Sequence, residues 1–262
     1  LVSKVPTNMN IAVDNINVGE DAVINITLPN EISNELVSVT IDGKSYTVLI
    51  NNGKGSLILS NLVANSYPIT AKYDGNYKYT EGENTTALTV AKMSSAVNVT
   101  ANNIKFGEEA VINIAVPNVS LGVATVVVNG KSYNVAIVDE KGVLNIYNLA
   151  AGDYNVDVTY LGDNKYLSST NAANFTVSKV SDYNMTVDIA DIVKGENATI
   201  TVTIPEDGTG SVIVTINGTD YKGTVIKGIA KVIIPDLDEG TYKVVTFYTG
   251  DNKYDSMIVN GT

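Results

Sequence analysis

A seven-residue pattern that returns twice constrains this sequence more than any other feature. The segment YLGDNKY at 160–166 recurs almost unchanged as YTGDNKY at 248–254, and a diverged copy, YDGNYKY, stands at 73–79. The first tyrosines of the three copies are 87 and 88 residues apart. A period that holds to within one residue over three copies indicates a tandem array of one structural unit of about 88 residues.

Each copy of the repeat contains a segment in which apolar and polar residues alternate, shortly after a Gly-Glu pair and just before a proline. The segments are residues 22–28, 110–116 and 198–204. A period of two is typical of a strand with one buried face. We therefore expect Ile24, Ile112 and Ile200 to be buried at equivalent positions of three separate cores.

An Asp-Gly or Asn-Gly pair lies between two further alternating segments in every copy. The pairs are Asp42-Gly43, Asn129-Gly130 and Asn217-Gly218. Such pairs favour two-residue β-hairpins, because both central positions need positive φ. A later strand in each copy alternates tyrosine with smaller residues and is expected to bury Tyr73, Tyr160 and Tyr248.

These patterns predict an all-β fold of three tandem immunoglobulin-like β-sandwiches. About seven short strands per repeat, with turns about every 8–12 residues and no helical periodicity, are typical of that sandwich. We assign residues 1–6 to the end of a preceding repeat, 7–92 to repeat 1, 93–179 to repeat 2, and 180–262 to repeat 3, whose last strand is incomplete. Because the linkers are almost absent, we expect a stiff, elongated rod.

The Gly-Glu pair, the Asn-Gly hairpin and the Tyr-x-Gly-Asp-x-x-Tyr segment together resemble the bacterial Ig-like repeats of archaeal adhesin-like surface proteins, best known from methanogens. The resemblance covers essentially the whole chain. The copy at 73–79 departs from it, because Gly75-Asn76 replaces Gly-Asp there. The resemblance implies an extracellular, cell-surface protein whose repeats serve as a stalk or as adhesive modules.

Composition excludes several kinds of site. The 262 residues include no Cys, His or Trp, and all 17 basic residues are Lys. The chain therefore has no disulfide, no thiolate zinc site, no cysteine nucleophile and no histidine base. The net charge of −11 repels nucleic acid and anionic membranes. We expect no catalysis, no cofactor other than structural calcium, and no membrane insertion by this segment.

Carboxylates in predicted end loops are the candidates for a calcium site. Asp163 and Asp251 lie in the repeated segment, and Asp182, Asp188 and Asp191 cluster near one repeat junction. Oxygen ligands from two repeats would bind calcium and stiffen the junction. The alternative is a solvated loop, because turn conformations alone recruit Asp and no spacing here matches a defined calcium loop.

Nine Asn-x-Ser/Thr sequons are candidates for N-glycosylation, a mild excess over the roughly five expected at random. They begin at Asn25, Asn84, Asn98, Asn118, Asn174, Asn184, Asn197, Asn217 and Asn260. Four tyrosines beyond the strand ends are candidates for ligand contact or for packing over the sandwich end. They are Tyr77, Tyr79, Tyr166 and Tyr254. An internal Lys–Asn cross-link would need a buried Lys, and no inward strand position carries one.

Three functions stay open at this point. The first is a non-enzymatic extracellular stalk that presents a surface, with neighbouring Ig-like repeats as its direct contacts. The second is a binding module for glycans or for host or microbial surfaces. The third is a filament subunit joined by donor-strand exchange, since residues 1–5 resemble the end of a last strand and repeat 3 lacks one.

Overall fold

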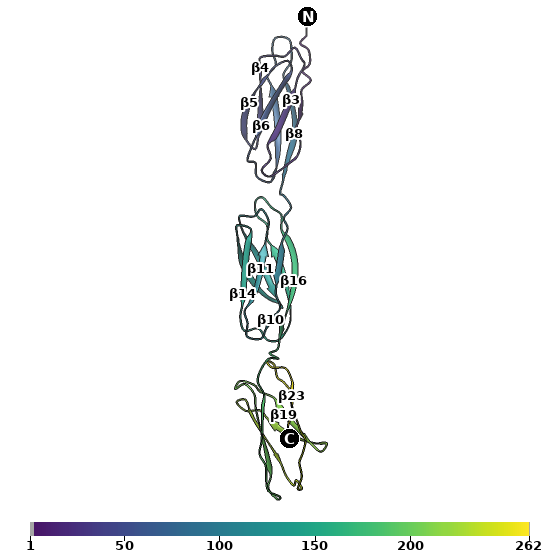
Figure 1. Ribbon diagram of the computed structural model, residues 1–262. Coiled ribbons are helices and arrows are strands. Elements are labelled where there is room, and N and C mark those ends of the chain that lie inside the picture. The colour runs from purple at the N-terminus through teal and green to yellow at the C-terminus, as the bar shows by residue number, and fades with distance from the viewer. Residues whose placement is uncertain (1–2, 262) are drawn as a thin grey trace.

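The computed structural model describes residues 3–261 and consists of three β-sandwiches stacked end to end in a rod (Figure 1). We call them unit one, unit two and unit three. Leu1 and Val2, assigned above to a preceding repeat, and Thr262 lie outside the described residues. The predicted all-β fold of tandem immunoglobulin-like sandwiches is confirmed.

Unit one contains, within the described residues, eight strands: β1 (Asn10–Ala12), β2 (Ile16–Asn17), β3 (Ala22–Thr27), β4 (Glu35–Ile41), β5 (Lys44–Ile50), β6 (Lys54–Leu59), β7 (Asn65–Tyr73) and β8 (Gly82–Ala91). Unit two repeats this set as β9 (Asn98–Ala101), β10 (Ile104–Lys105), β11 (Ala110–Ala115), β12 (Leu121–Val128), β13 (Lys131–Val138), β14 (Lys141–Ile146), β15 (Gly152–Tyr160) and β16 (Ser169–Ser178). Unit three has β17 (Thr186–Ile189), β18 (Ala198–Thr203), β19 (Ser211–Ile216), β20 (Thr219–Thr224), β21 (Ile229–Ile234), β22 (Val244–Tyr248) and β23 (Met257–Gly261).

Each unit packs a three-stranded sheet against a larger one. In unit one the orders are β1-β3-β6 and β2-β8-β7-β4-β5, and all neighbours are antiparallel except β2 and β8. Unit two has the same orders, but a pair between Val138 and Lys141 joins the two sheets into one ladder. Unit three has β17-β18-β21 and β20-β19-β22-β23, without a counterpart of β2 among its described residues.

The first strand of units one and two is split, which is why they have eight strands and not the predicted seven. Its first half pairs with β3 or β11, and its second half crosses over and runs parallel to β8 or β16. An asparagine lies at each crossing. The Oδ1 atom of Asn15 accepts a hydrogen bond from the Thr89 N–H (2.8 Å), and Asn103 does the same for Thr176 (2.8 Å). The asparagine side chain thus replaces a backbone partner where the strand changes sheet.

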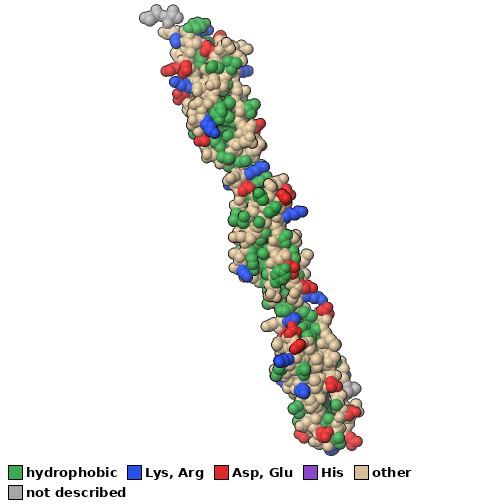
Figure 2. All heavy atoms as spheres, turned by 90° about the vertical axis from the view of Figure 1, so that its left-hand side faces the viewer, with side chains coloured by type: hydrophobic (Ala, Val, Ile, Leu, Met, Phe, Trp, Pro, Cys, Tyr) green, Lys and Arg blue, Asp and Glu red, His purple; other side chains and the backbone are tan. Residues whose placement is uncertain are grey.

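Three separate hydrophobic cores fill the sandwiches, one in each unit. Ile24, Ile112 and Ile200 are at most 1% exposed, at equivalent positions of β3, β11 and β18. The predicted alternation is confirmed, because the residues between them on these strands point outward. On the face shown in Figure 2, exposed hydrophobic side chains lie among polar and charged ones along all three units.

The predicted hairpins are confirmed by the backbone. Both central residues have positive φ in each case: 49° and 71° at Asp42-Gly43, 44° and 84° at Asn129-Gly130, and 49° and 78° at Asn217-Gly218. A second feature typical of immunoglobulin-like sandwiches is a tyrosine whose hydroxyl donates to a backbone carbonyl four residues upstream. Tyr67, Tyr154 and Tyr242 do this to Val63, Ala150 and Asp238, at 2.9, 3.0 and 2.7 Å.

Val5 was assigned from the sequence to a preceding repeat, but it is hydrogen-bonded to unit one. The Val5 N–H donates to the Lys78 carbonyl (2.9 Å), and the Thr80 N–H donates to the Val5 carbonyl (3.0 Å). Met93 and Val180 make the same parallel bridge in units two and three. Each unit therefore begins with a residue that forms a β-bridge to a turn of the same unit more than 70 residues later in the chain. The alternation of apolar and polar residues is too local to reveal such a contact.

No helix that the structure describes is long and apolar enough to cross a membrane.

Candidate functional site at the unit junctions

The repeated seven-residue segments form the turns at the end of each sandwich, where one unit meets the next. We call residues 73–79, 160–166 and 248–254 the junction turns. In units two and three they face the preceding unit. The tyrosine that opens each turn is at most 1% exposed, and burial raises the pKa of Tyr73 and of Tyr160 to about 12. These hydroxyls are buried structural groups, not acids that ionise near neutral pH.

The tyrosine that closes each turn is buried as well. Tyr79, Tyr166 and Tyr254 are 4–7% exposed and belong to, or pack against, the three cores. Of the two interpretations given above for these side chains, packing over the sandwich end is the one observed. Tyr77 differs, because it is 91% exposed.

An Asx side chain holds every junction turn closed. The Oδ1 atom of Asp163 accepts hydrogen bonds from the N–H groups of Lys165 (2.7 Å) and Tyr166 (2.6 Å). Asp251 accepts the same two bonds in unit three, at 2.8 and 2.7 Å. Asn76 accepts them in unit one, both at 2.8 Å. The departure of unit one from the Gly-Asp pattern thus preserves the turn, because the turn needs a carboxamide or carboxylate oxygen and not a charge.

The glycine before each Asx residue is required by the same geometry. Gly75, Gly162 and Gly250 have φ between 74° and 79°. A Cβ at these positions would lie 2.8–2.9 Å from backbone atoms of the residues that follow the turn. Because φ is positive and backbone atoms approach closely, glycine fits these positions and a residue with a Cβ does not.

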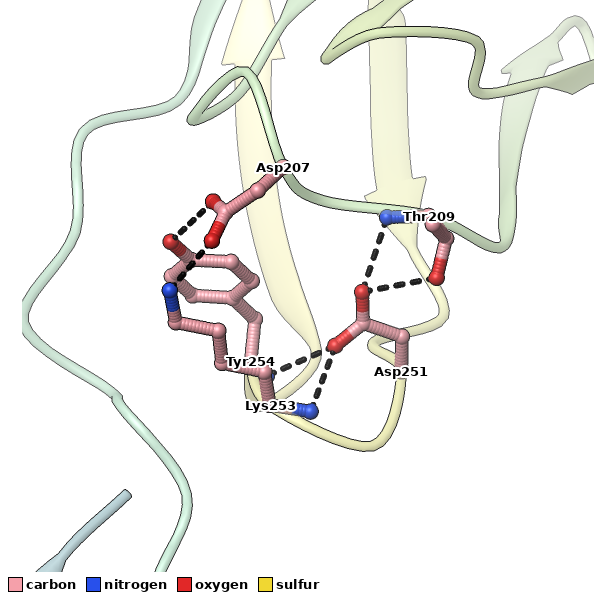
Figure 3. A network of polar contacts seen from close by, with 5 residues as sticks. All are labelled: Asp207, Thr209, Asp251, Lys253 and Tyr254. Atoms are coloured by element: carbon pink, nitrogen blue, oxygen red, sulfur yellow. Dashed lines mark hydrogen bonds and ion pairs between the residues drawn. The ribbon is translucent and has the colours of Figure 1, made fainter. Parts of the chain in front are cut away.

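Unit three adds a second set of contacts to this turn (Figure 3). The Oδ2 atom of Asp251 accepts hydrogen bonds from the N–H and the hydroxyl of Thr209, at 2.8 and 2.9 Å. Burial alone would raise the pKa of Asp251, but the N–H groups of Tyr254, Thr209 and Lys253 outweigh burial and lower the pKa to about 2. Asp251 is therefore a structural carboxylate whose oxygens are occupied by its own unit.

Asp207, from the loop between β18 and β19, closes the other side of the network in Figure 3. Its carboxylate accepts the Tyr254 hydroxyl (2.8 Å) and forms an ion pair with the Lys253 ammonium. The hydrogen bond from Lys253 and then that from Tyr254 lower the pKa of Asp207. Tyr79 in unit one donates to Glu31 in the equivalent loop (3.1 Å), whereas unit two has the buried Val119 there.

Two contacts between side chains cross the junction of units two and three. The Lys105 ammonium lies 2.9 Å from Asp182 Oδ2, and the Lys253 ammonium lies 5.6 Å from the centre of the Phe106 ring. The hydrogen bond and charge of Lys105 lower the pKa of Asp182. At the junction of units one and two, the Lys92 ammonium instead donates to the backbone carbonyl of Asp163.

The five calcium candidates are not brought together. Asp163 and Asp251 cap their own turns, Asp182 pairs with Lys105, and Asp188 is exposed on β17. Asp191 is also exposed and lies at the position of Asn15 and Asn103. Among residues 3–261 there is no group of three or more His, Cys, Asp or Glu side chains able to hold a metal ion. A calcium site stays a prediction without a ligand set.

The nine sequons divide by exposure. Eight of the asparagines are exposed, and Asn84 is half-buried. The Asn84 amide donates to the Met9 carbonyl (2.8 Å) and its oxygen accepts the Thr85 N–H (2.8 Å). Asn171 makes the same pair of bonds in unit two and is not part of a sequon. The Asn84 amide therefore has a structural role, and glycosylation of the other eight stays a prediction.

Sequence reasoning missed the residues that cross the second junction or brace the junction turn of unit three: Lys105, Phe106, Asp207, Thr209 and Lys253. The one available signal was the invariant lysine of the GDNKY pattern. Asp207 and Thr209 lie 42–47 residues from their partners in the junction turn, and Lys105 lies 77 residues from Asp182, so nothing in the period pointed to these pairs.

No protein-family model matches the chain, and no curated protein sequence matches it either. Among solved structures it is similar to a part of a 1.5-MDa bacterial ice-binding adhesin, with 15% identity, 99% of this chain and 97% of that chain covered, and a TM-score of 0.38. It is also similar to the I9–I11 tandem of titin (11%, 97% and 98%, 0.32). A third is the central fibronectin-III array of RIM-binding protein (16%, 100% and 100%, 0.25). At these identities and TM-scores the similarities assign no ligand or activity, and the chain is described by its fold, a tandem array of immunoglobulin-like β-sandwiches.

Proposed function

We propose that this chain is a non-enzymatic stalk segment of an extracellular, adhesin-like cell-surface protein. Its repeats resemble those of archaeal adhesin-like surface proteins. The observation that carries the proposal is the end-to-end stacking of three self-contained cores with direct contacts at both junctions. Such an array is extended, so it keeps its two ends far apart. Its building units are the predicted repeats 7–92, 93–179 and 180–262, with Val5 added to the first.

The strand arrangement supports a load-bearing role. In units one and two the chain enters at one end of the sandwich and leaves at the other, and β2 and β10 run parallel to β8 and β16 beside them. A pull along the rod therefore acts lengthwise on neighbouring strands, so that several ladder hydrogen bonds must break together. A stalk under tension needs this property, whereas an enzyme or a compact binding domain does not.

The surface is consistent with a solvent-exposed stalk. A net charge of −11 keeps neighbouring stalks apart, and the charge is spread over all three units. Glycans at the eight exposed sequon asparagines would point away from the cores and leave the sandwiches intact. No arrangement among the described residues favours the glycan-binding alternative to the same degree.

Small-angle X-ray scattering of the protein in dilute solution tests the proposal. Units of about 35–40 Å in line predict a radius of gyration of about 30–35 Å, whereas a compact globule of the same length predicts about 18 Å. A value near the compact limit would refute the stalk. Reproducible binding to a glycan array at sub-millimolar concentration would favour the binding module instead.

A further inference from the structure

Unit three carries a row of apolar side chains on the outer face of its larger sheet. Ile213 lies opposite Lys222 on one neighbouring strand and opposite Phe247 on the other. Phe247 in turn lies opposite Ile258, so the row crosses all four strands of the sheet. Ile258 is 61% exposed, and Ile213 and Phe247 are partly exposed. The core of unit three lies on the other face of the sheet, so these side chains do not fill it.

Units one and two carry polar side chains in the same row. In the order of the strands, the row consists of Thr47, Ser38, Lys72 and Glu83 in unit one, and of Asn134, Thr125, Thr159 and Thr170 in unit two. The sandwich therefore folds with a polar row at this position. An aromatic ring and two isoleucines in its place indicate a contact outside the sandwich.

The size of the row limits the strength of that contact. Four strands about 4.8 Å apart, with five residues each in β22 and β23 at about 3.3 Å per residue, give a face of about 300 Å². A stable protein–protein interface takes about 800 Å² from each partner. The row therefore supports a weak contact, which is occupied when the partner is held close by. Copies of one stalk standing side by side would meet that condition.

The row is complementary to itself when two copies lie parallel. A two-fold axis along the rod places β20 of one copy against β23 of the other, and β19 against β22. Ile213 of each copy then packs on Phe247 of the other, and the alkyl stem of Lys222 covers Ile258. A two-fold axis across the strands would instead give antiparallel rods and bring the two Lys222 ammonium groups together.

The charges near the row also favour the parallel arrangement. Lys222 forms no ion pair among residues 3–261, and Asp220 on the same strand is engaged by the Thr215 hydroxyl (2.6 Å). Asp255 is exposed and lies three residues before Ile258, near the strand that Lys222 faces in the second copy. The chain as a whole is acidic and repels a second copy, which confines the contact to this face.

We propose that unit three pairs with unit three of a second copy of this chain, parallel and face to face, by packing these two rows together. No strand is exchanged, because the sheets meet through their side chains at about 10 Å. Asn260 lies two residues after Ile258 and points to the same face, so the pairing requires an Asn260 without a glycan. The contact itself does not depend on the stalk function, which would supply only the high local concentration.

Methyl NMR of the intact, unglycosylated protein with labelled isoleucines tests the pairing over about 0.02–2 mM. We expect the signals of Ile213 and Ile258 to shift with concentration and to approach those of a dimer. Ile58 and Ile233 are matched controls, because both are 60% exposed on the smaller sheets, and their signals should stay in place. Equal shifts at Ile258 and at both controls would mean non-specific association. That result, or an unchanged Ile258 signal, would overturn the proposal.

Two variants locate the contact by sedimentation at the same concentrations. Phe247→Thr gives unit three the residue that unit two has in this row, Thr159, and should weaken association at least about tenfold. Leu121→Thr removes a side chain of unit two that is 72% exposed and should leave association unchanged. Undiminished association of Phe247→Thr, or loss of association in Leu121→Thr, would assign the contact to another surface and refute the pairing.

A spin label on Lys54→Cys in unit one reports how the two copies are oriented. Parallel rods bring the two labels within the range of pulsed electron resonance. Antiparallel rods joined at unit three would place them at opposite ends, roughly 150 Å apart. A dimer without a measurable distance between the labels would rule out the parallel pair. The scattering experiment in dilute solution tests the stalk separately, because the weak dimer is dissociated there.

Discussion

The two junctions join units of the same kind, yet different contacts hold them. Both share the backbone bridge that Met93 or Val180 makes to the junction turn of its own unit. At the second junction Lys105 and Phe106 of unit two contact Asp182 and Lys253 of unit three. The equivalent residues at the first junction cannot do so. Asn17 and Val18 stand for Lys105 and Phe106, Ser95 stands for Asp182, and only Lys165 keeps its identity with Lys253.

The difference separates what builds a unit from what couples two units. The turn itself survives the change from Asp to Asn in unit one, because its backbone needs only an acceptor oxygen. The coupling contacts depend on side chains that the sandwich does not require. Two adjacent residues, Lys105 and Phe106, therefore distinguish a junction with an ion pair and a cation–π contact from one without them.

The largest expected effect comes from Asp251→Ala. This change removes the acceptor of three backbone N–H groups and one hydroxyl in unit three. We expect the free energy of unfolding of unit three to fall by about 2–4 kcal/mol. Asp163→Ala removes the acceptor of two backbone N–H groups in unit two and should cost about 1–2 kcal/mol. Hydrogen exchange of peptides from each unit in increasing urea measures both, and equal losses would contradict the asymmetry.

A smaller effect is expected from acid. The pKa of Asp251 in the folded state is about 2, below its ordinary value of 3.8, so its stabilisation is present above pH ~4 and is lost as the pH falls towards 2. We expect unit three to lose roughly 1 kcal/mol relative to unit one over this range, because solvent screening reduces the full linkage value. Unit one has the uncharged Asn76 in this turn. Asp251→Asn should remove the part of the difference that Asp251 causes, whereas the lowered pKa values of Asp207 and Asp182 leave a smaller remainder. An unchanged difference in this variant would contradict the role of Asp251.

The ion pair of the second junction should affect orientation more than stability. Lys105→Ala, Asp182→Ala and the double variant are each expected to broaden the distribution of distances between units two and three, and to do so equally. Because the chain has no Cys, spin labels on Lys141→Cys and Lys222→Cys can report this distribution by pulsed electron resonance. High salt should broaden it in the unmodified junction, since both side chains are exposed. If the double variant broadens the distribution as much as the two single variants added together, the two residues act independently.

The smallest expected effect is a gain at the first junction. Asn17→Lys combined with Ser95→Asp introduces the ion pair there and should narrow the distances between units one and two. The Ser95 hydroxyl donates to the Leu167 carbonyl and is hydrogen-bonded to the Ser169 hydroxyl in its own unit, so the substitution also removes local contacts. Ser95→Asp alone is the control, because it loses those contacts without gaining the pair. If the distance distribution of the double variant is no narrower than that of this control, the relative orientation of units one and two depends on other groups.

The fold was predictable because its determinants are local and repeated. The alternation around Ile24, the paired positive φ at Asn129-Gly130 and the buried Tyr160 all follow from neighbours in the chain. The split first strand was not predictable, since Asn15 acts on Thr89, which is 74 residues away. The same reason hid Asp207 and Thr209, which reach the junction turn from a loop with no repeated pattern.

The bridge that opens each unit has a mechanical consequence. Because Met93 is hydrogen-bonded to unit two and not to unit one, the unfolding of unit one under force leaves the first β-bridge of unit two intact. Under a high pulling force the units would then unfold one at a time, and each unfolded unit would lengthen the chain by roughly 250 Å. A stalk built in this way would lengthen in steps before any covalent bond of the chain breaks.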